Sequence, residues 1–229
     1  MKQSEIKGIY FWHRENTSDY KTFDEVIKRD VYRKKGMTIE KGENWIDCGG
    51  NVGAFTLLAC SAGANVTVYE PDPFSCKMIE KNLKLNNFNA QIVCAGLVHN
   101  DIKRTNLYVG NNGNVWRNSM CKNWNGKGIK VDCVNFDEVI KDNQCVKMDI
   151  EGAEMAILEN TKRIFKKLVF EWSFDVDASL PRFWNIIEKL EKTQKVMSVG
   201  NTAKFKSRDY DTWQKSWFPA CTNVFAYNK

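Results

Sequence analysis

The sequence predicts an α/β fold with a mostly parallel sheet, helices on both faces and an antiparallel strand at the C-terminal end. From residue 43 onward, short β-rich segments alternate with helical segments, as in βαβ units. The strand segments are continuous apolar runs, which fits strands that are covered on both faces. A glycine-rich turn joins the first strand to the first helix, and open α/β sheets bind ligands at such turns.

These elements follow one another in a regular order. Helices are expected at residues 52–63, 73–86, 153–165 and 181–192, between strands at 43–49, 65–71, 90–97, 144–150, 167–174, 196–200 and 222–228. The rhythm changes at about 104–134, where two strand-like segments flank a polar loop at 111–128. We expect this strand pair to be an insertion into the main fold.

One domain is expected over residues 1–229, because no repeat, low-complexity segment or proline-rich linker marks a boundary. Residues 43–229 form its predicted core. Residues 1–42 are expected to form a helical cap, with a helix that begins at Thr22 or Asp24 and ends near Gly36.

The composition is that of a globular protein, with 43% hydrophobic and 27% charged residues. No apolar run approaches the roughly 20 residues that cross a membrane, and the N-terminus lacks the apolar stretch of a signal peptide. The eight cysteines form no CxxC pair and several lie in apolar strands, which favours free thiols and a cytoplasmic location. The net charge of +6 comes from lysines scattered among glutamates, as on solvated helix surfaces, and not from a basic stripe.

A nucleoside-binding motif is the clearest chemical signal. The first strand ends at Asp47, Gly49, Asn51 and Gly53 form the turn, and Glu70 ends the next strand. Such a turn presents backbone N–H groups to a ligand, and a carboxylate at the position of Glu70 accepts hydrogen bonds from ribose hydroxyls. A nicotinamide site would instead have GxGxxG, and an acid beside its pyrophosphate would be repelled. Asp47 therefore favours the cationic methionine end of S-adenosylmethionine.

Three segments together resemble the FkbM family of methyltransferases: WIDCGGNVGAFTLLA, VYEPDPFSCKMIEKNLKLNN and VKMDIEGAEMAIL. The resemblance covers about residues 42–172 and implies a Rossmann-like class I methyltransferase fold. It implies S-adenosylmethionine as cofactor, contacted by Asp47, Gly49, Asn51, Gly53 and Glu70. It also implies methylation of a hydroxyl oxygen, typically on a sugar or a polyketide-type product.

Two acids at strand ends are candidates for the chemistry. Asp149 ends one strand and Glu171 lies at the matching end of the next, where open α/β sheets bind ligands. A hydroxyl needs a general base, so either residue could take its proton, and binding of an ion such as Mg²⁺ is a less favoured alternative. Glu151 and Glu154 begin a helix, where acids are favoured whatever the function. Lys147 is expected to face away from Asp149.

The acceptor is expected to be a small molecule or glycan with a hydroxyl, and tryptophans in two loops are candidates to bind it: Trp116, with Arg117, and Trp213 with Trp217. A nucleic-acid methyltransferase is the alternative within the enzyme class, and ribose 2′-O-methylation stays open because lysines and acids coexist near Asp149. Against it stand the absence of an NPPY or DPPY segment and of a concentrated basic stripe. A non-catalytic scaffold that keeps the fold is the alternative from another class.

Overall fold

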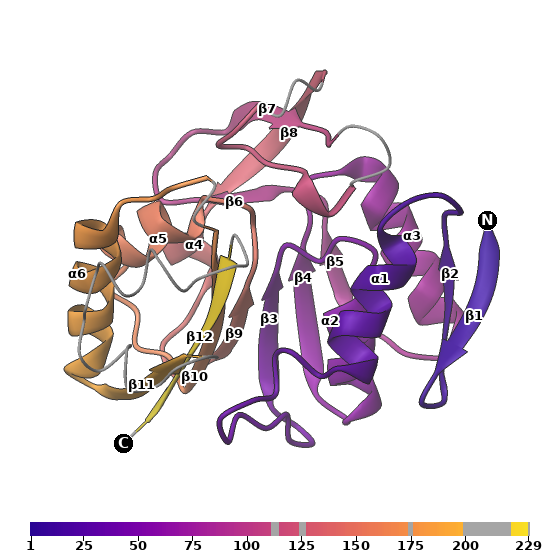
Figure 1. The fold of residues 1–229 in the computed structure, drawn as a ribbon, viewed down its shortest axis with the longest axis horizontal. Coiled ribbons are helices and arrows are strands. Elements are labelled where there is room, and N and C mark those ends of the chain that lie inside the picture. Colours follow the sequence, from indigo (N-terminus) through magenta and orange to yellow (C-terminus); the bar gives the residue numbers. More distant parts are fainter. Residues whose placement is uncertain (111–114, 124–126, 174–175, 199–220, 229) are drawn as a thin grey trace.

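A seven-stranded sheet forms the centre of the protein in the computed structural model (Figure 1), which describes residues 1–110, 115–123, 127–173, 176–198 and 221–228. From one edge to the other, its strands are β11 (Gln194–Ser198), β12 (Cys221–Asn228), β10 (Lys167–Ser173), β9 (Cys145–Met148), β3 (Asn44–Cys48), β4 (Asn65–Tyr69) and β5 (Gln91–Val93). Six of them run in the same direction, and β12 runs antiparallel to both of its neighbours, β10 and β11. The predicted fold class is therefore confirmed.

The register places the ends of neighbouring strands side by side. Asp47 of β3 lies opposite Lys147 of β9 and opposite Val68 of β4. Because parallel strands end at a common edge, the residues that follow β3, β4 and β9 gather there. This edge holds the candidate site.

Helices cover both faces of the sheet, as predicted. In Figure 1, α1, α2 and α3 lie on one side and α4, α5 and α6 on the other. Successive strand residues alternate between two hydrophobic cores, one on each face of the sheet. Trp45 packs in the core beneath α2 and α3, and Ile46 packs in the core beneath α5 and α6. The helices are α2 (Ala54–Ser61), α3 (Pro73–Leu85), α4 (Phe136–Val139), α5 (Glu154–Asn160) and α6 (Leu180–Glu191).

The insertion predicted at about 104–134 holds the expected strand pair, and a strand that precedes it joins the pair in a small three-stranded sheet. β7 (Arg104–Tyr108) and β8 (Gly128–Asn135) pair antiparallel, and β6 (Gly96–Val98) joins β8 in parallel. The expected third strand at 90–97 is thus divided between β5 of the main sheet and β6 of the small one. A short 3-10 helix, η2 (Val115–Arg117), lies between β7 and β8 in the sequence, and the small sheet closes over the site edge at the top of Figure 1.

The N-terminal segment differs from the expected helical cap. It begins with a hairpin of β1 (Lys2–Ile6) and β2 (Ile9–His13), whose two-residue turn has positive φ at both Lys7 and Gly8. The helix that follows begins earlier than predicted, as α1 (Asp19–Phe23), and continues as a π-helical turn, η1 (Asp24–Lys28). It ends before Gly36 because Asp30 takes a left-handed conformation, with φ of 58°.

Two further findings concern the chain as a whole. Among the helices that the structure describes, none combines the length and the apolar character of a membrane span. The eight cysteines all fall in the described part and are free thiols, as predicted. The cytoplasmic location stays a prediction.

Candidate active site

The turn after β3 is shaped by close backbone approach. Gly49 has φ of +82°, and a Cβ added there would lie 2.0 Å from the carbonyl oxygen of Asp149. The amides of Gly49 and Gly50 both donate to the carbonyl oxygen of Tyr69, at 2.9 and 3.2 Å. The first residue after β3 is thus held against the ends of β4 and β9, and only glycine fits. Gly53, with φ of +92°, is the N-cap of α2 and does not line the pocket described below.

Glu70 follows β4 and turns its carboxylate back to the same loop. Its Oε2 accepts from the backbone N–H of Asn51 at 2.7 Å, and its Oε1 accepts from that of Asp72 at 2.8 Å. Burial raises the pKa of Glu70 to about 8, against the opposing effect of these two hydrogen bonds. Asp72 then caps α3 by accepting from the N–H of Phe74 at 3.0 Å, which fixes where that helix begins.

Asp47 stands behind the pocket wall, and it does not line the pocket itself. Its carboxylate is fully buried, with Oδ1 3.1 Å from Lys147 Nζ and Oδ2 accepting from the hydroxyl of Thr56 at 2.7 Å. Lys147 also donates to the carbonyl oxygen of Gly49 at 2.7 Å. This buried ion pair fixes the glycine turn, and the contact of Asp47 with the cofactor stays a prediction.

Asp149 lies directly after β9, on the same side of the sheet as Lys147. The expectation that Lys147 faces away is wrong, because residues two apart in a strand share a face. Tyr32, from the segment after η1, donates its hydroxyl proton to Asp149 Oδ2 at 2.5 Å. The ring of Tyr32 lies beneath Lys147 Nζ, 5.5 Å from its centroid. No sequence pattern predicts this contact, because Tyr32 and Asp149 are 117 positions apart in the chain.

Three carboxylates gather at this end of the site. One oxygen each of Asp149, Glu151 and Glu171 lies within 4.8 Å of the other two. Burial, and then the charge of Asp149, hold the pKa of Glu171 well above its ordinary value. Glu154 has a structural role, since it accepts from the N–H groups of Ile150 and Gly152 at 2.6 and 2.7 Å.

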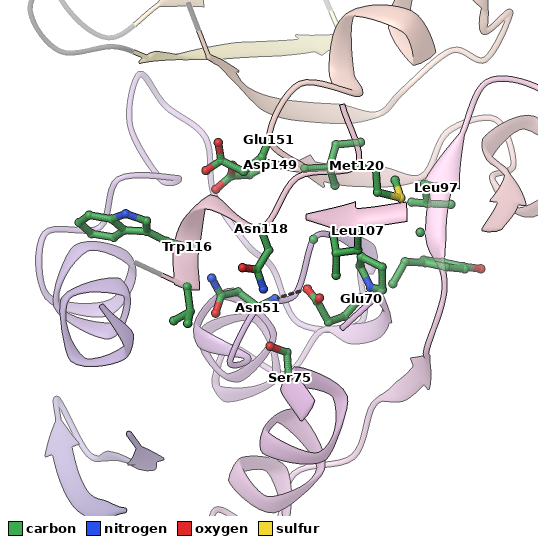
Figure 2. A pocket seen from close by; sticks show the side chains of 16 residues that line it. Asn51, Glu70, Ser75, Leu97, Leu107, Trp116, Asn118, Met120, Asp149 and Glu151 are labelled. Carbon is green, nitrogen blue, oxygen red and sulfur yellow. Dashed lines mark hydrogen bonds between the residues drawn. The ribbon is translucent and has the colours of Figure 1, made fainter. Parts of the chain in front are cut away.

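A pocket of about 510 Å³, including its opening to solvent, connects these groups (Figure 2). Glu70 and Asn51 lie at one end, with Ser75 of α3 below them, and Asp149 and Glu151 lie at the other. Apolar side chains close the remaining side: Leu97 and Leu107 from the small sheet, and Met120 from the segment between β7 and β8. Of the predicted cofactor residues, Gly49, Asn51 and Glu70 line this pocket. Glu171 adjoins it through the carboxylate cluster.

Of the predicted acceptor residues, Trp116 lines the pocket, on η2. Its backbone N–H donates to the hydroxyl of Ser18 at 3.2 Å, and Lys21 Nζ lies 5.7 Å from its ring centroid. Arg117 is in the same short helix but does not line the pocket. Trp213 and Trp217 lie outside the described residues.

Comparison with known proteins adds two findings. The profile of the family described as the methyltransferase FkbM domain matches residues 47–197 of this chain. No curated protein matches the chain.

Solved structures share the fold at low sequence identity. A chain of a fibrillarin/Nop5p complex is 12% identical, with a TM-score of 0.51 and coverage of 99% of this chain and 97% of that one. A putative rRNA methylase from Clostridium thermocellum is 10% identical, with a TM-score of 0.49 and coverage of 94% and 98%. A tRNA (uracil-54, C5)-methyltransferase from Pyrococcus abyssi, in complex with S-adenosyl-L-homocysteine, is 13% identical, with a TM-score of 0.49 and coverage of 98% and 43%.

Proposed function

Because this chain belongs to the FkbM family of methyltransferases, we propose that it transfers the methyl group of S-adenosylmethionine to a hydroxyl oxygen of a sugar, glycan or related metabolite. The observation that carries the proposal is the layout of one pocket: the buried carboxylate of Glu70 lies at one end and the half-buried carboxylate of Asp149 lies at the other. A nucleoside recognised at the first end would present its reactive group towards the second.

The residues present fit this cofactor. Glu70 uses its two oxygens to accept backbone N–H groups, and each oxygen keeps a lone pair for a ribose hydroxyl. Asn51 Oδ1 is buried, lines the pocket and has no partner within the described part of the chain, so a donor group of a ligand would satisfy it. When bound, S-adenosylmethionine supplies a methyl group on a positively charged sulfur.

The carboxylate end of the pocket supplies the base. An acceptor hydroxyl is a poor nucleophile near neutral pH and needs a group that takes its proton. Burial raises the pKa of Glu171 well above its ordinary value, which favours the protonated form of that side chain and makes it the less suitable group to take a proton. Asp149 then accepts the hydroxyl proton on its carboxylate, and Trp116 offers an aromatic face to the C–H surface of a sugar.

Nucleic acid is the less favoured acceptor. Asp149, Glu151 and Glu171 concentrate negative charge where an acceptor would enter, and this charge repels a phosphate backbone. Lys147, which a ribose-methylating arrangement would need beside the acceptor, is engaged with Asp47 and with the carbonyl oxygen of Gly49. The proposal therefore places the acceptor among neutral or amino-substituted hydroxyl compounds.

Binding of the cofactor is the first test. Isothermal titration with S-adenosylmethionine and S-adenosylhomocysteine is expected to give micromolar affinity, and Glu70→Ala is expected to weaken it by about 10- to 100-fold, the usual effect of losing hydrogen bonds to a charged group. Glu80→Ala is the matched control, because Glu80 is an exposed acid on α3 that pairs only with Lys84 among the described residues. Binding of NADH in place of both ligands would indicate a dehydrogenase, and binding of none of the three would indicate a scaffold.

The acceptor is tested by transfer of a labelled methyl group to a panel of neutral sugars, amino sugars, acidic sugars and short RNA, with and without Mg²⁺. Asp149→Asn is expected to abolish transfer while S-adenosylhomocysteine still binds. Trp116→Ala is expected to raise the KM of the acceptor and leave that affinity unchanged. Methylation of RNA alone would contradict the proposed acceptor class.

A further inference from the structure

Tyr32 reaches the carboxylate end of the pocket from outside the part of the chain that the family profile matches. It lies 15 residues before residue 47, where that match begins. Its side chain is 5% exposed and packs edge-on against Phe55 of α2, with 5.7 Å between ring centroids. A tyrosine buried this deeply needs a partner for its hydroxyl. That partner is Asp149.

The hydrogen bond has a defined direction. Burial, together with the charges of Asp149 and Glu171, raises the pKa of Tyr32 well above its ordinary value. The phenol therefore keeps its proton and acts as the hydrogen-bond donor. Asp149 Oδ2 accepts this hydrogen bond at 2.5 Å, and no described residue donates a hydrogen bond to Oδ1. One carboxylate oxygen is therefore fixed by Tyr32, and the other stays available in the pocket.

We propose that Tyr32 is a positioning residue for methyl transfer, whose hydroxyl fixes the orientation of Asp149 so that its free oxygen takes the acceptor proton. This inference rests on the proposed function, since it assigns to Asp149 the role of base. The ring packs edge-on against Phe55, and the ammonium group of Lys147 lies 5.5 Å from its centroid, so its hydroxyl has little freedom to leave Asp149.

Other charged groups face Asp149 from several elements. The carboxylates are Glu25 of η1, Asp47 of β3, Glu151 before α5, Glu154 of α5 and Glu171 of β10. Within the described part of the chain, Lys147 of β9 is the cation that faces Asp149, and the thiol of Cys221 on β12 is a further titratable group. Tyr32 is the neutral hydrogen-bond donor in this set, and a donor to a carboxylate stabilises its charged form.

Tyr32→Phe removes the hydroxyl and keeps the ring. The carboxyl carbon of Asp149 is followed by ¹³C NMR in the ligand-free protein, with Asp149→Asn to assign its signal, so this measurement does not depend on cofactor or acceptor. The ¹³C signal of this carboxyl carbon is expected to move in Tyr32→Phe, because Oδ2 then loses the hydroxyl that donates to it. Tyr10→Phe, which alters an exposed tyrosine on β2, is the control and is expected to leave the signal unmoved.

A reciprocal measurement covers the case in which Tyr32→Phe does not fold. Asp149→Asn is expected to lower the pKa of Tyr32, followed by tyrosinate absorbance, because it removes a neighbouring negative charge. If neither the ¹³C signal of Asp149 nor the absorbance titration of Tyr32 changes, Tyr32 only fills space and the inference is overturned. If both move but no methyl acceptor exists, the coupling stands and the proposed function fails. With an acceptor in hand, kcat of Tyr32→Phe is expected to fall about tenfold or more at unchanged affinity for S-adenosylhomocysteine.

Discussion

Alanine substitution at two glycines separates backbone strain from close approach. Gly49 and Gly42 have nearly the same φ, +82° and +81°, in the region that side chains other than glycine rarely adopt. A Cβ on Gly42 would meet nothing within 4 Å, whereas one on Gly49 would lie 2.0 Å from the carbonyl oxygen of Asp149. Both substitutions therefore carry the conformational cost, and only Gly49→Ala adds a collision with backbone.

The expected magnitudes follow from these two terms. A left-handed residue with a Cβ costs about 1–2 kcal/mol. Relieving the collision requires movement of the end of β9, and overpacking of this kind costs about 1–3 kcal/mol. The free energy of unfolding is thus expected to fall by about 1–2 kcal/mol in Gly42→Ala and by about 2–5 kcal/mol in Gly49→Ala.

Urea unfolding of both variants, followed by circular dichroism, measures this difference, and titration with S-adenosylhomocysteine measures its effect on the site. Gly49→Ala is expected to bind more weakly, because the displaced backbone carries Asp149 at the pocket, while Gly42→Ala binds like the parent protein. Equal losses of stability in the two variants would refute the reasoning that β9 and the glycine turn are in direct contact.

Three further predictions concern charge and redox chemistry. Because the pKa of Glu70 is raised to about 8, its carboxyl is mostly protonated at pH 7 and must ionise to accept ribose hydroxyls. The affinity for S-adenosylhomocysteine should therefore rise up to about pH 8, and binding at pH 7 should release about 0.9 proton, which calorimetry in two buffers measures. An affinity that does not change with pH would contradict this. Lys147→Met should lower the free energy of unfolding, measured in urea, by about 3–5 kcal/mol at pH 8, because it leaves the buried carboxylate of Asp47 without its partner. The loss should be smaller at pH 5, because burial raises the pKa of Asp47 and a protonated Asp47 carries no unpaired charge. An equal loss at both pH values would contradict this. The Sγ atoms of Cys76 and Cys94 are 2.6 Å apart, so treatment with oxidised glutathione should join them in a disulfide, which mass spectrometry detects. Glutathione that stays attached to Cys94 alone would count against their proximity.

Sequence reasoning succeeded where the signals are local. The turn at Gly49 and the helix that begins at Pro73 are each determined by residues within a few positions, and the structure has both where they were expected. Glu70 could also be placed, because the end of a second parallel strand lies beside the end of the first. The alternation of strands and helices also predicted the mostly parallel sheet, although it does not determine the order of the strands within it.

The N-terminal segment was predicted poorly, although its sequence holds a signal. Ile6 and Ile9 flank a two-residue turn at Lys7 and Gly8, but the turn lacks the Asn-Gly or Asp-Gly pair that most clearly marks a hairpin. The error about Lys147 was one of period, because residues two apart in a strand share a face. Its pairing with Asp47 could have been anticipated from two oppositely charged residues in adjacent apolar strands.

The contacts that build the acceptor end of the pocket are of another kind, since they join distant segments. Tyr32 and Asp149 are brought together by tertiary packing alone, as are Ser18 and Trp116. In both pairs the first residue precedes the segment that the family profile matches, and the second lies within it. The matched segment supplies the turn and Glu70, which would hold a cofactor common to the family. The segment before it contributes Tyr32 and Ser18 to the opposite end of the pocket, where the proposed base and the aromatic face lie. Selection of the acceptor by this chain is therefore expected to depend on residues 1–46 as well as on the matched segment.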